Sequence, residues 1–314
     1  MKKIIYIMGA GRSGTTLLDI ILGNGDNLFS CGELNHYPRV HPPQMQGLPQ
    51  FETGFYKRIK THPEGALDEP HHQFYYQSLQ FWQQVLQTLT AKQGGSIDFQ
   101  KLNQLHARYE YHSAFFKKHN RHSKAKQTYN TFIRHLYESI FEHIDADIIV
   151  DSSKYPMRAL QLAEILPYEL NYLYLKRDPV GVVESFEKKQ FPNMHKSWLG
   201  ANQYYLLTNM LCRTISQQLK KTHPVLEIYY EDLILKPTQT LKYIETQFNI
   251  DLTTSLTKIH NQQSLEVGYL FCGNPLRKKP HIKLQQHLPK RPPTLKNTLT
   301  RIVNKPIYNS GLKN

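Results

Sequence analysis

The sequence predicts an α/β protein with a doubly wound parallel sheet, and three observations lead to that prediction. Short apolar runs rich in β-branched residues alternate with stretches of helical apolar spacing, which is the pattern of strands covered by helices on both faces. A glycine-rich or polar turn follows each of these apolar runs. One long segment, residues 37–145, lacks the alternation, and we expect it to be a helical insertion.

The first two expected strands each lead into a helix. A strand over residues 4–8 is joined to a helix over residues 16–22 by a glycine-rich turn. A strand over residues 147–150 precedes a helix that begins at Pro156, because proline is favoured at the first position of a helix.

Two more units of the same kind follow. A strand over residues 171–176 leads to a helix around residues 182–186, and a strand over residues 225–230 is followed by a helix after Pro237. Ligands of open parallel sheets bind at the carboxyl ends of the strands. The turns after all four strands therefore mark the expected site.

The domain organisation follows from these units. We expect one main domain, residues 1–280, and a basic C-terminal tail, residues 281–314. Helices are expected within the insertion over residues 74–89 and 132–144. The insertion is a candidate acceptor pocket and lid, with a purely covering helical layer as the alternative. The sequence leaves open the roles of the insertion and of the tail after Pro289.

The chain is strongly basic, with 39 Lys and Arg residues against 25 Asp and Glu residues and a net charge of +14. Such an excess predicts an anionic partner. Ten of the basic residues lie between Arg277 and the end of the chain, where no acid occurs. A nonenzymatic module that binds nucleic acid or an acidic membrane surface is therefore an alternative to an enzyme.

Composition disfavours several other classes of protein. Hydrophobic residues make up 39% and charged residues 20% of the chain, which argues against disorder or a coiled coil. The three cysteines lack CxxC spacing, so neither a zinc site nor a disulfide framework is expected. No run of 18 apolar residues occurs, and the apolar run at the N-terminus is too short for a signal peptide. We expect a reduced, cytoplasmic protein without a transmembrane segment.

The strongest chemical motif is the turn Gly9-Ala10-Gly11-Arg12-Ser13-Gly14-Thr15-Thr16. Its glycines let backbone N–H groups converge on an anion, and the next helix adds its N-terminal dipole, which predicts a phosphate cradle. Gly9, Gly14 and Thr16 fit the P-loop pattern GxxxxGK[ST]. Thr15, however, replaces the lysine that contacts the β- and γ-phosphates. A phosphotransferase that uses ATP is thus disfavoured but stays an alternative.

Residues 12–18, RSGTTLL, resemble the 5′-phosphosulfate-binding loop of the sulfotransferases that use 3′-phosphoadenosine 5′-phosphosulfate, hereafter PAPS. LKRDP at residues 175–179, with Ser185 eight residues after Arg177, is similar to the 3′-phosphate motif of that family. The resemblance implies a P-loop-like fold with PAPS as co-substrate. It implies that the 5′ end of PAPS is bound by Gly11, Arg12, Ser13, Gly14, Thr15 and Thr16, and its 3′-phosphate by Arg177 and Ser185.

Three further segments resemble the bacterial and tyrosylprotein members most closely. CGEL at residues 31–34 stands where tyrosylprotein sulfotransferases have a Glu as general base, which implies that role for Glu33. Lys154 ends a DSSK segment where these enzymes have a Lys near the bridging oxygen of PAPS, and GNPLR at 273–277 is similar to a bacterial GNPxR segment. The resemblance implies that Glu33, Lys154 and Arg12 are catalytic and that Arg277 binds PAPS.

The chain also departs from part of the family. Cytosolic sulfotransferases use a His base within a Lys-Thr-His segment, and the DSSK segment stands at that strand end here. For Glu33, the alternative is a carboxylate that only holds Arg12 or a loop amide. The 16 histidines form no metal-binding spacing, so no metal is expected.

The sequence as a whole predicts a sulfotransferase that moves a sulfuryl group from PAPS to a hydroxyl or an amine of a small acceptor, which we expect to be a secondary metabolite. No nucleic-acid partner is expected. The ATP phosphotransferase and the nonenzymatic basic module remain the alternatives. The identity of the acceptor, O- or N-sulfation and the oligomeric state are left open by the sequence.

Overall fold

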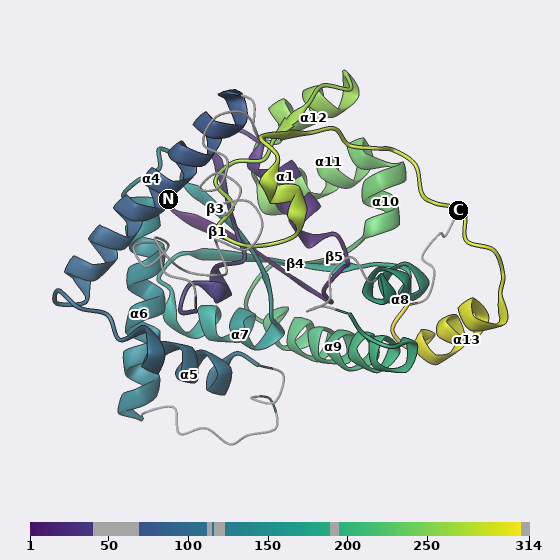
Figure 1. The fold of residues 1–314 in the computed structure, drawn as a ribbon, viewed down its shortest axis with the longest axis horizontal. Helices are drawn as coiled ribbons and strands as arrows, with labels where there is room; N and C mark the ends of the chain where they lie inside the picture. The colour runs from purple at the N-terminus through teal and green to yellow at the C-terminus, as the bar shows by residue number, and fades with distance from the viewer. Residues whose placement is uncertain (40–68, 112–114, 116–122, 189–194, 309–314) are drawn as a thin grey trace.

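The computed structural model describes residues 1–39, 69–111, 115, 123–188 and 195–308, which form a parallel five-stranded sheet with helices on both faces (Figure 1). The strand order is β2-β3-β1-β4-β5. The strands are β1 (Lys3–Gly9), β2 (Leu28–Gly32), β3 (Ile148–Lys154), β4 (Glu169–Lys176) and β5 (Val225–Tyr229). The predicted doubly wound sheet is confirmed. β2 is an additional strand that the sequence analysis did not predict.

Helices precede or follow every strand of the sheet. They are α1 (Thr15–Gly23), α4 (Glu69–Lys92), α5 (Phe99–Tyr109), α6 (Lys124–Phe141), α7 (Pro156–Ile165), α8 (Pro179–Glu187), α9 (Trp198–Leu219), α10 (Tyr230–Leu235), α11 (Pro237–Phe248), α12 (Thr253–His260) and α13 (Leu295–Asn304). No helix within the described ranges has the length and apolar content needed to span a membrane.

The central strand β1 contributes to both cores because its side chains alternate between the two faces of the sheet. Ile4, Tyr6 and Met8 pack into the core that α4, α6, α7 and α9 cover. Ile5 and Ile7 pack into the opposite core, under α1, α11 and α12. Every residue of β1 is buried, as a strand covered on both faces requires.

Most of the described part of the insertion is helical, with α4, α5 and α6 joined by turns or short loops where the structure describes them. The helix predicted over residues 74–89 lies within α4. The one predicted over residues 132–144 begins earlier, at the start of α6, because the Ser123 side chain accepts a hydrogen bond from the Lys126 N–H and caps the helix there. The division of the chain at residue 280 stays a prediction.

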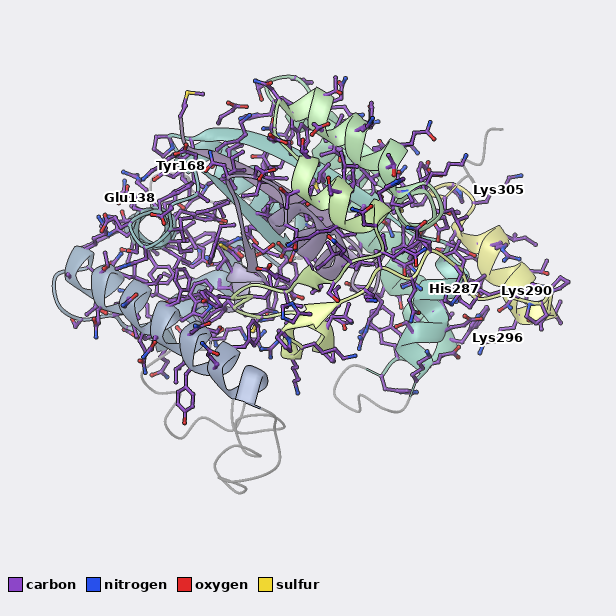
Figure 2. The ribbon with its side chains drawn as sticks, turned by 90° about the horizontal axis from the view of Figure 1, so that it is seen from above. Glu138, Tyr168, His287, Lys290, Lys296 and Lys305 are labelled. Atoms are coloured by element: carbon purple, nitrogen blue, oxygen red, sulfur yellow. The ribbon has the colours of Figure 1, made fainter. Side chains whose placement is uncertain are left out.

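The C-terminal segment packs on the main domain as far as residue 308. Trp198 Nε1 of α9 donates to Thr300 Oγ1 of α13 at 2.8 Å, and Tyr308 Oη donates to Glu231 Oε2 at 2.8 Å. Figure 2, in which the molecule is seen from above, shows Lys290, Lys296 and Lys305 around α13 at one end of the molecule.

Candidate active site

A cavity of about 1110 Å³ lies where the strands of the sheet end, as the sequence analysis expected. It is lined by the glycine-rich loop after β1, by residues after β2, β3, β4 and β5, and by the segment around Arg277. Among the residues that line it, six are Lys or Arg (Arg12, Arg39, Lys154, Arg177, Lys196, Arg277) and one, Glu33, is acidic. A cavity with this balance of charge suits a ligand with several negative charges.

The glycine-rich loop holds its shape through two left-handed residues. Arg12 has φ 69° and Gly14 has φ 94°, and a Cβ at Gly14 would lie 2.5 Å from the ring of Tyr230. The Gly11 N–H donates to Tyr204 Oη at 2.9 Å, which fixes the loop from α9. Glycine at position 14 is thus required by both backbone and space.

The loop offers donors that the protein itself does not use. Ser13 is fully buried, and its Oγ has no hydrogen-bond partner among the described residues. Thr15 and Thr16 open α1, where the first N–H groups have no partner within the helix. These groups fit the anionic end of a ligand, which would satisfy them.

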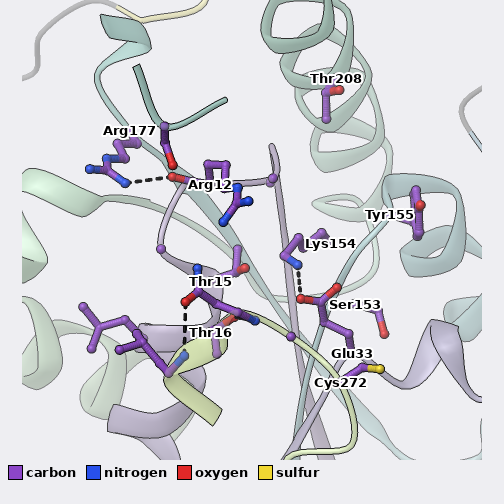
Figure 3. A pocket seen from close by; sticks show the side chains of 18 of the residues that line it. Arg12, Thr15, Thr16, Glu33, Ser153, Lys154, Tyr155, Arg177, Thr208 and Cys272 are labelled. Carbon is purple, nitrogen blue, oxygen red and sulfur yellow. Dashed lines mark hydrogen bonds and ion pairs between the residues drawn. The ribbon is translucent and has the colours of Figure 1, made fainter. Parts of the chain in front are cut away.

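Glu33 and Lys154 form an ion pair inside the cavity (Figure 3). Glu33 follows β2 and lies 3.4 Å from His36 Nε2, while Lys154 ends β3 with a left-handed φ of 73°. Burial alone would raise the pKa of Glu33, but the charge of Lys154 and the contacts with His36 lower it to about 2. Lys154 lines the cavity from this left-handed position, and non-glycine residues in such conformations are typical of functional sites.

Arg12 and Arg177 meet on the other side of the loop. Arg177 Nη1 donates to the carbonyl oxygen of Arg12 at 2.8 Å (Figure 3), and its guanidinium lies 4.3 Å from the centre of the Tyr230 ring. Burial lowers the pKa of Arg177, and the nearby charge of Arg291 adds to this effect. A bound phosphate would offset both causes. Ser185 lies on α8, eight residues after Arg177, and lines the same cavity.

Arg277 reaches the cavity from a short 3-10 turn, η6 (Pro275–Lys278). The Asn274 side chain caps this turn by accepting from the Leu276 N–H, and the Asn274 N–H donates to Thr16 Oγ1 at 3.3 Å. The turn is therefore fixed against the start of α1. Arg277 Nε is buried and has no hydrogen-bond partner in the described part of the chain, so it too fits an anionic ligand.

A buried ionic cluster supports the backbone on which the Glu33–Lys154 pair stands. Arg158 of α7 is fully buried and donates to Glu110 Oε1 at 2.7 Å and to Asp151 Oδ2 at 3.4 Å. Asp151 accepts from both the N–H and the hydroxyl of Ser153. Ser153 Oγ in turn accepts from the Asn35 N–H at 2.9 Å, which ties the end of β3 to the turn after β2.

The structure thus places ten of the eleven predicted site residues on the lining of one cavity, and the eleventh, Ser13, is buried within the glycine-rich loop. Several residues that belong with them were not predicted from the sequence. Tyr204 of α9 contacts Gly11, and Tyr230, the first residue of α10, contacts Arg177; neither was assigned to the site from the sequence. Arg291 also went unnoticed: it lies beside Arg177 and pairs with Glu184 at 2.9 Å.

Asp19 could have been found from the sequence, since a lone acid interrupts the apolar run of α1. It is fully buried and accepts from the Gly32 N–H at 3.1 Å and from Ser152 Oγ at 2.6 Å. Burial raises the pKa of Asp19 to about 7, against the opposing effect of these hydrogen bonds. It ties α1 to β2 and β3 just before the residues that carry the site.

No cluster of three metal-ligating side chains is found within the described residues. The neighbours of Glu33 are Lys154 and His36 rather than further carboxylates that could share a metal ion with it. The donor set of the cavity is therefore cationic and fits an anionic organic ligand.

Comparison with known proteins adds a family match over most of the chain. Residues 5–254 match the model of the sulfotransferase family. No curated protein matches.

Solved structures similar to the chain include two sulfotransferase domains. One is from the curacin biosynthetic pathway, with 17% identity, a TM-score of 0.48 and coverage of 96% of this chain and 97% of that chain. The other is from the olefin synthase of Synechococcus PCC 7002, with 18% identity, a TM-score of 0.47 and coverage of 98% and 95%. A sulfotransferase from Mycobacterium avium gives 11% identity, a TM-score of 0.46 and coverage of 83% and 67%.

Proposed function

The chain belongs to the sulfotransferase family, and on that premise we propose that it transfers a sulfuryl group from PAPS to a hydroxyl or an amine of a small acceptor. The observation that carries this proposal is the convergence of three features in one cavity. They are the glycine-rich loop with Arg12, the strand-end Arg177 with Ser185, and the Glu33–Lys154 pair.

The residues divide into two groups that match the two ends of PAPS. Around the loop, the buried Ser13 hydroxyl, the start of α1 and Arg12 fit a phosphosulfate. After the end of β4, Arg177 and Ser185 both line the cavity, and a guanidinium with a hydroxyl fits a 3′-phosphate. Arg277, held on η6, adds a third cation toward the same donor.

PAPS supplies an activated sulfuryl group and a phosphate leaving group on which negative charge grows. Preorganised cations beside such a group contribute strongly to catalysis. Lys154 is held by its ion pair with Glu33, and Arg12 lies against the ring of Phe186, so both cations are positioned beside the loop.

Glu33 is proposed as the general base that takes the proton of the acceptor. It faces the cavity beside Lys154 and has no second acid near it among the cavity-lining residues. The acceptor side of the cavity continues past Glu33 to His36, Tyr111 and Tyr155. The volume of about 1110 Å³ exceeds the range of about 300–1,000 Å³ typical of a single ligand, which leaves room for a donor and a small acceptor together. A secondary metabolite as acceptor stays part of this proposal.

The loop geometry does not favour the ATP alternative. Thr15 stands in place of the P-loop lysine and is 2% exposed at the start of α1, so its side chain cannot reach along a triphosphate. The cation of the loop is Arg12, which lies against Phe186 with the guanidinium 6.0 Å from the ring centre.

A thermal-shift comparison tests the proposed donor. We expect 3′-phosphoadenosine 5′-phosphate to stabilise the protein by about 2.7 kcal/mol when present at a hundredfold excess over its dissociation constant. ATP and adenosine 5′-phosphate at the same concentration should give much smaller shifts, because both lack the 3′-phosphate that Arg177 and Ser185 are placed to bind. Equal shifts with ATP would instead support a phosphotransferase.

A further inference from the structure

The last helix, α13, turns its polar side toward the protein. Asn297, Thr300 and Asn304 are its buried residues, spaced along one face. Thr300 accepts a hydrogen bond from the indole of Trp198, and Asn304 Nδ2 donates to Asn202 Oδ1 at 2.8 Å. The helix is therefore fixed to α9 by polar contacts rather than by an apolar core.

The opposite side of α13 is an exposed aliphatic stripe, which we call the α13 ridge. Its members are Leu295, Leu299, Ile302 and Val303, with exposed fractions of 77%, 40%, 60% and 43%. Their spacing of i, i+4, i+7 and i+8 places them on one face of the helix. Single exposed leucines are ordinary, whereas a contiguous stripe of four indicates an interaction surface.

Positive charge surrounds the ridge. Lys296 and Arg301 lie on the same helix, and Lys290 and Lys305 lie just before and just after it (Figure 2). Neither α13 nor the neighbouring α9 contains an Asp or a Glu. Glu187 of α8 pairs with Lys296 at 2.7 Å, and Asp178, the cap of α8, pairs with Arg301 at 3.6 Å. Lys290 and Lys305 form no ion pair with any of the described residues, so they carry the uncompensated positive charge beside the ridge.

We propose that the α13 ridge docks the protein on the surface of an anionic phospholipid membrane. An amphipathic helix with aliphatic residues on one face and Lys or Arg beside them lies in the plane of such a surface. The aliphatic side chains enter the boundary between headgroups and acyl chains, and the cations contact the lipid phosphates. The rigid attachment of α13 through Thr300 and Asn304 presents the ridge without any rearrangement of the fold.

Charge decides between a membrane and a second copy of the chain. A symmetric pair of α13 ridges would bring Lys290 and Lys305 of both copies together without any acid on α13 or α9 to pair with them, and like charges so placed repel. Nucleic acid offers phosphates but no apolar layer for four exposed aliphatic side chains. An anionic bilayer offers both.

Sedimentation with vesicles tests the proposal on the full chain. We expect binding to vesicles of phosphatidylglycerol mixed with phosphatidylcholine and little binding to phosphatidylcholine alone. The double variant Leu299→Gln/Ile302→Gln should lower the partition coefficient about a hundredfold, because each aliphatic side chain contributes about tenfold. Lys305→Gln should lower it about fivefold, the share of one cation near an anionic surface.

Leu235→Gln is the matched control, since Leu235 is an exposed leucine on α10, away from the ridge. It should bind vesicles like the unmodified protein. All variants are first checked for unchanged melting temperature, because the replaced side chains are exposed. Equal binding to neutral vesicles, no binding to any vesicle, or dimerisation that the double variant abolishes would each overturn the proposal.

Discussion

Replacement of Glu33 by Gln is expected to lower turnover by about 10²–10⁴-fold, the usual contribution of a positioned general base. Gln keeps the shape of the side chain but cannot accept the proton of the acceptor. Affinity for 3′-phosphoadenosine 5′-phosphate should change little, because Glu33 is not among the residues proposed to contact it. Steady-state kcat with the best available acceptor, together with calorimetry of the donor product, measures both effects.

Glu227→Gln is the matched control for this variant. Glu227 is also paired with a lysine, at 2.6 Å from Lys176, but it does not line the cavity. It should turn over like the unmodified enzyme. Normal turnover of Glu33→Gln with a weakly acidic hydroxyl acceptor would show that Glu33 only holds its neighbours.

The pH profile gives a second readout of Glu33. In the free protein its pKa is lowered to about 2, so Glu33 is deprotonated well below neutral pH and adds no acid limb to kcat/KM near pH 5. Once PAPS engages Lys154, the charge that lowers this pKa is offset and the pKa rises. We therefore expect the acid limb of the kcat profile to lie at higher pH than the acid limb of the kcat/KM profile. Glu33→Gln should lack the acid limb in kcat.

The second large effect is expected on stability. Arg158→Met should lower the free energy of unfolding by about 3–5 kcal/mol, because it removes the buried guanidinium that pairs with both Asp151 and Glu110, and Glu110 keeps only its contact with His106 at 3.0 Å as an ionic partner among the described residues. Urea unfolding at neutral pH measures the loss. The variant should also lower activity where it stays folded, since Asp151 and Ser153 fix the end of β3 that carries Lys154.

Lys92→Met is the control for Arg158→Met. Lys92 pairs with Glu142 at 2.8 Å in a partly exposed position, and pairs of that kind contribute at most about 1 kcal/mol. A loss below about 1 kcal/mol for Arg158→Met as well would mean that the buried cluster relaxes or takes up a proton instead of remaining charged.

The local hydrophobic pattern of the sequence was enough to predict the strands that end at the turns lining the cavity. The runs at β1, β3, β4 and β5 are short, apolar and bounded by polar turns, and each carries its site residue directly after or at its end. β2 escaped prediction because its five residues, Leu28 to Gly32, include a serine and a glycine and follow a helix that is itself apolar. The pairing of β2 with β3 is a long-range property that local pattern does not carry.

The motifs also located most of the charged residues that line the cavity, but not Arg39 and Lys196, and not the residues that contact the predicted ones. Glu33 and Lys154 lie 121 residues apart, and only the adjacent positions of β2 and β3 bring them into contact. Tyr204 and Arg291 reach the loop and Arg177 from α9 and from the C-terminal segment. Such contacts depend on how helices pack across the sheet, which no single segment specifies.

The central claim is that Arg177 and its neighbours bind a 3′-phosphate, and calorimetry of two ligands with two proteins tests it most directly. The unmodified protein and Arg177→Ala are each titrated with 3′-phosphoadenosine 5′-phosphate and with adenosine 5′-phosphate. A charge-assisted contact with one phosphate contributes about 1.5–3 kcal/mol, so Arg177→Ala should weaken binding of the first ligand about ten- to hundredfold. Binding of adenosine 5′-phosphate should be nearly unchanged, which would also show that the loop contact between Arg177 and the Arg12 carbonyl is not what is measured. Equal weakening of both ligands, or no weakening of either, would contradict the assignment of this site to a donor with a 3′-phosphate.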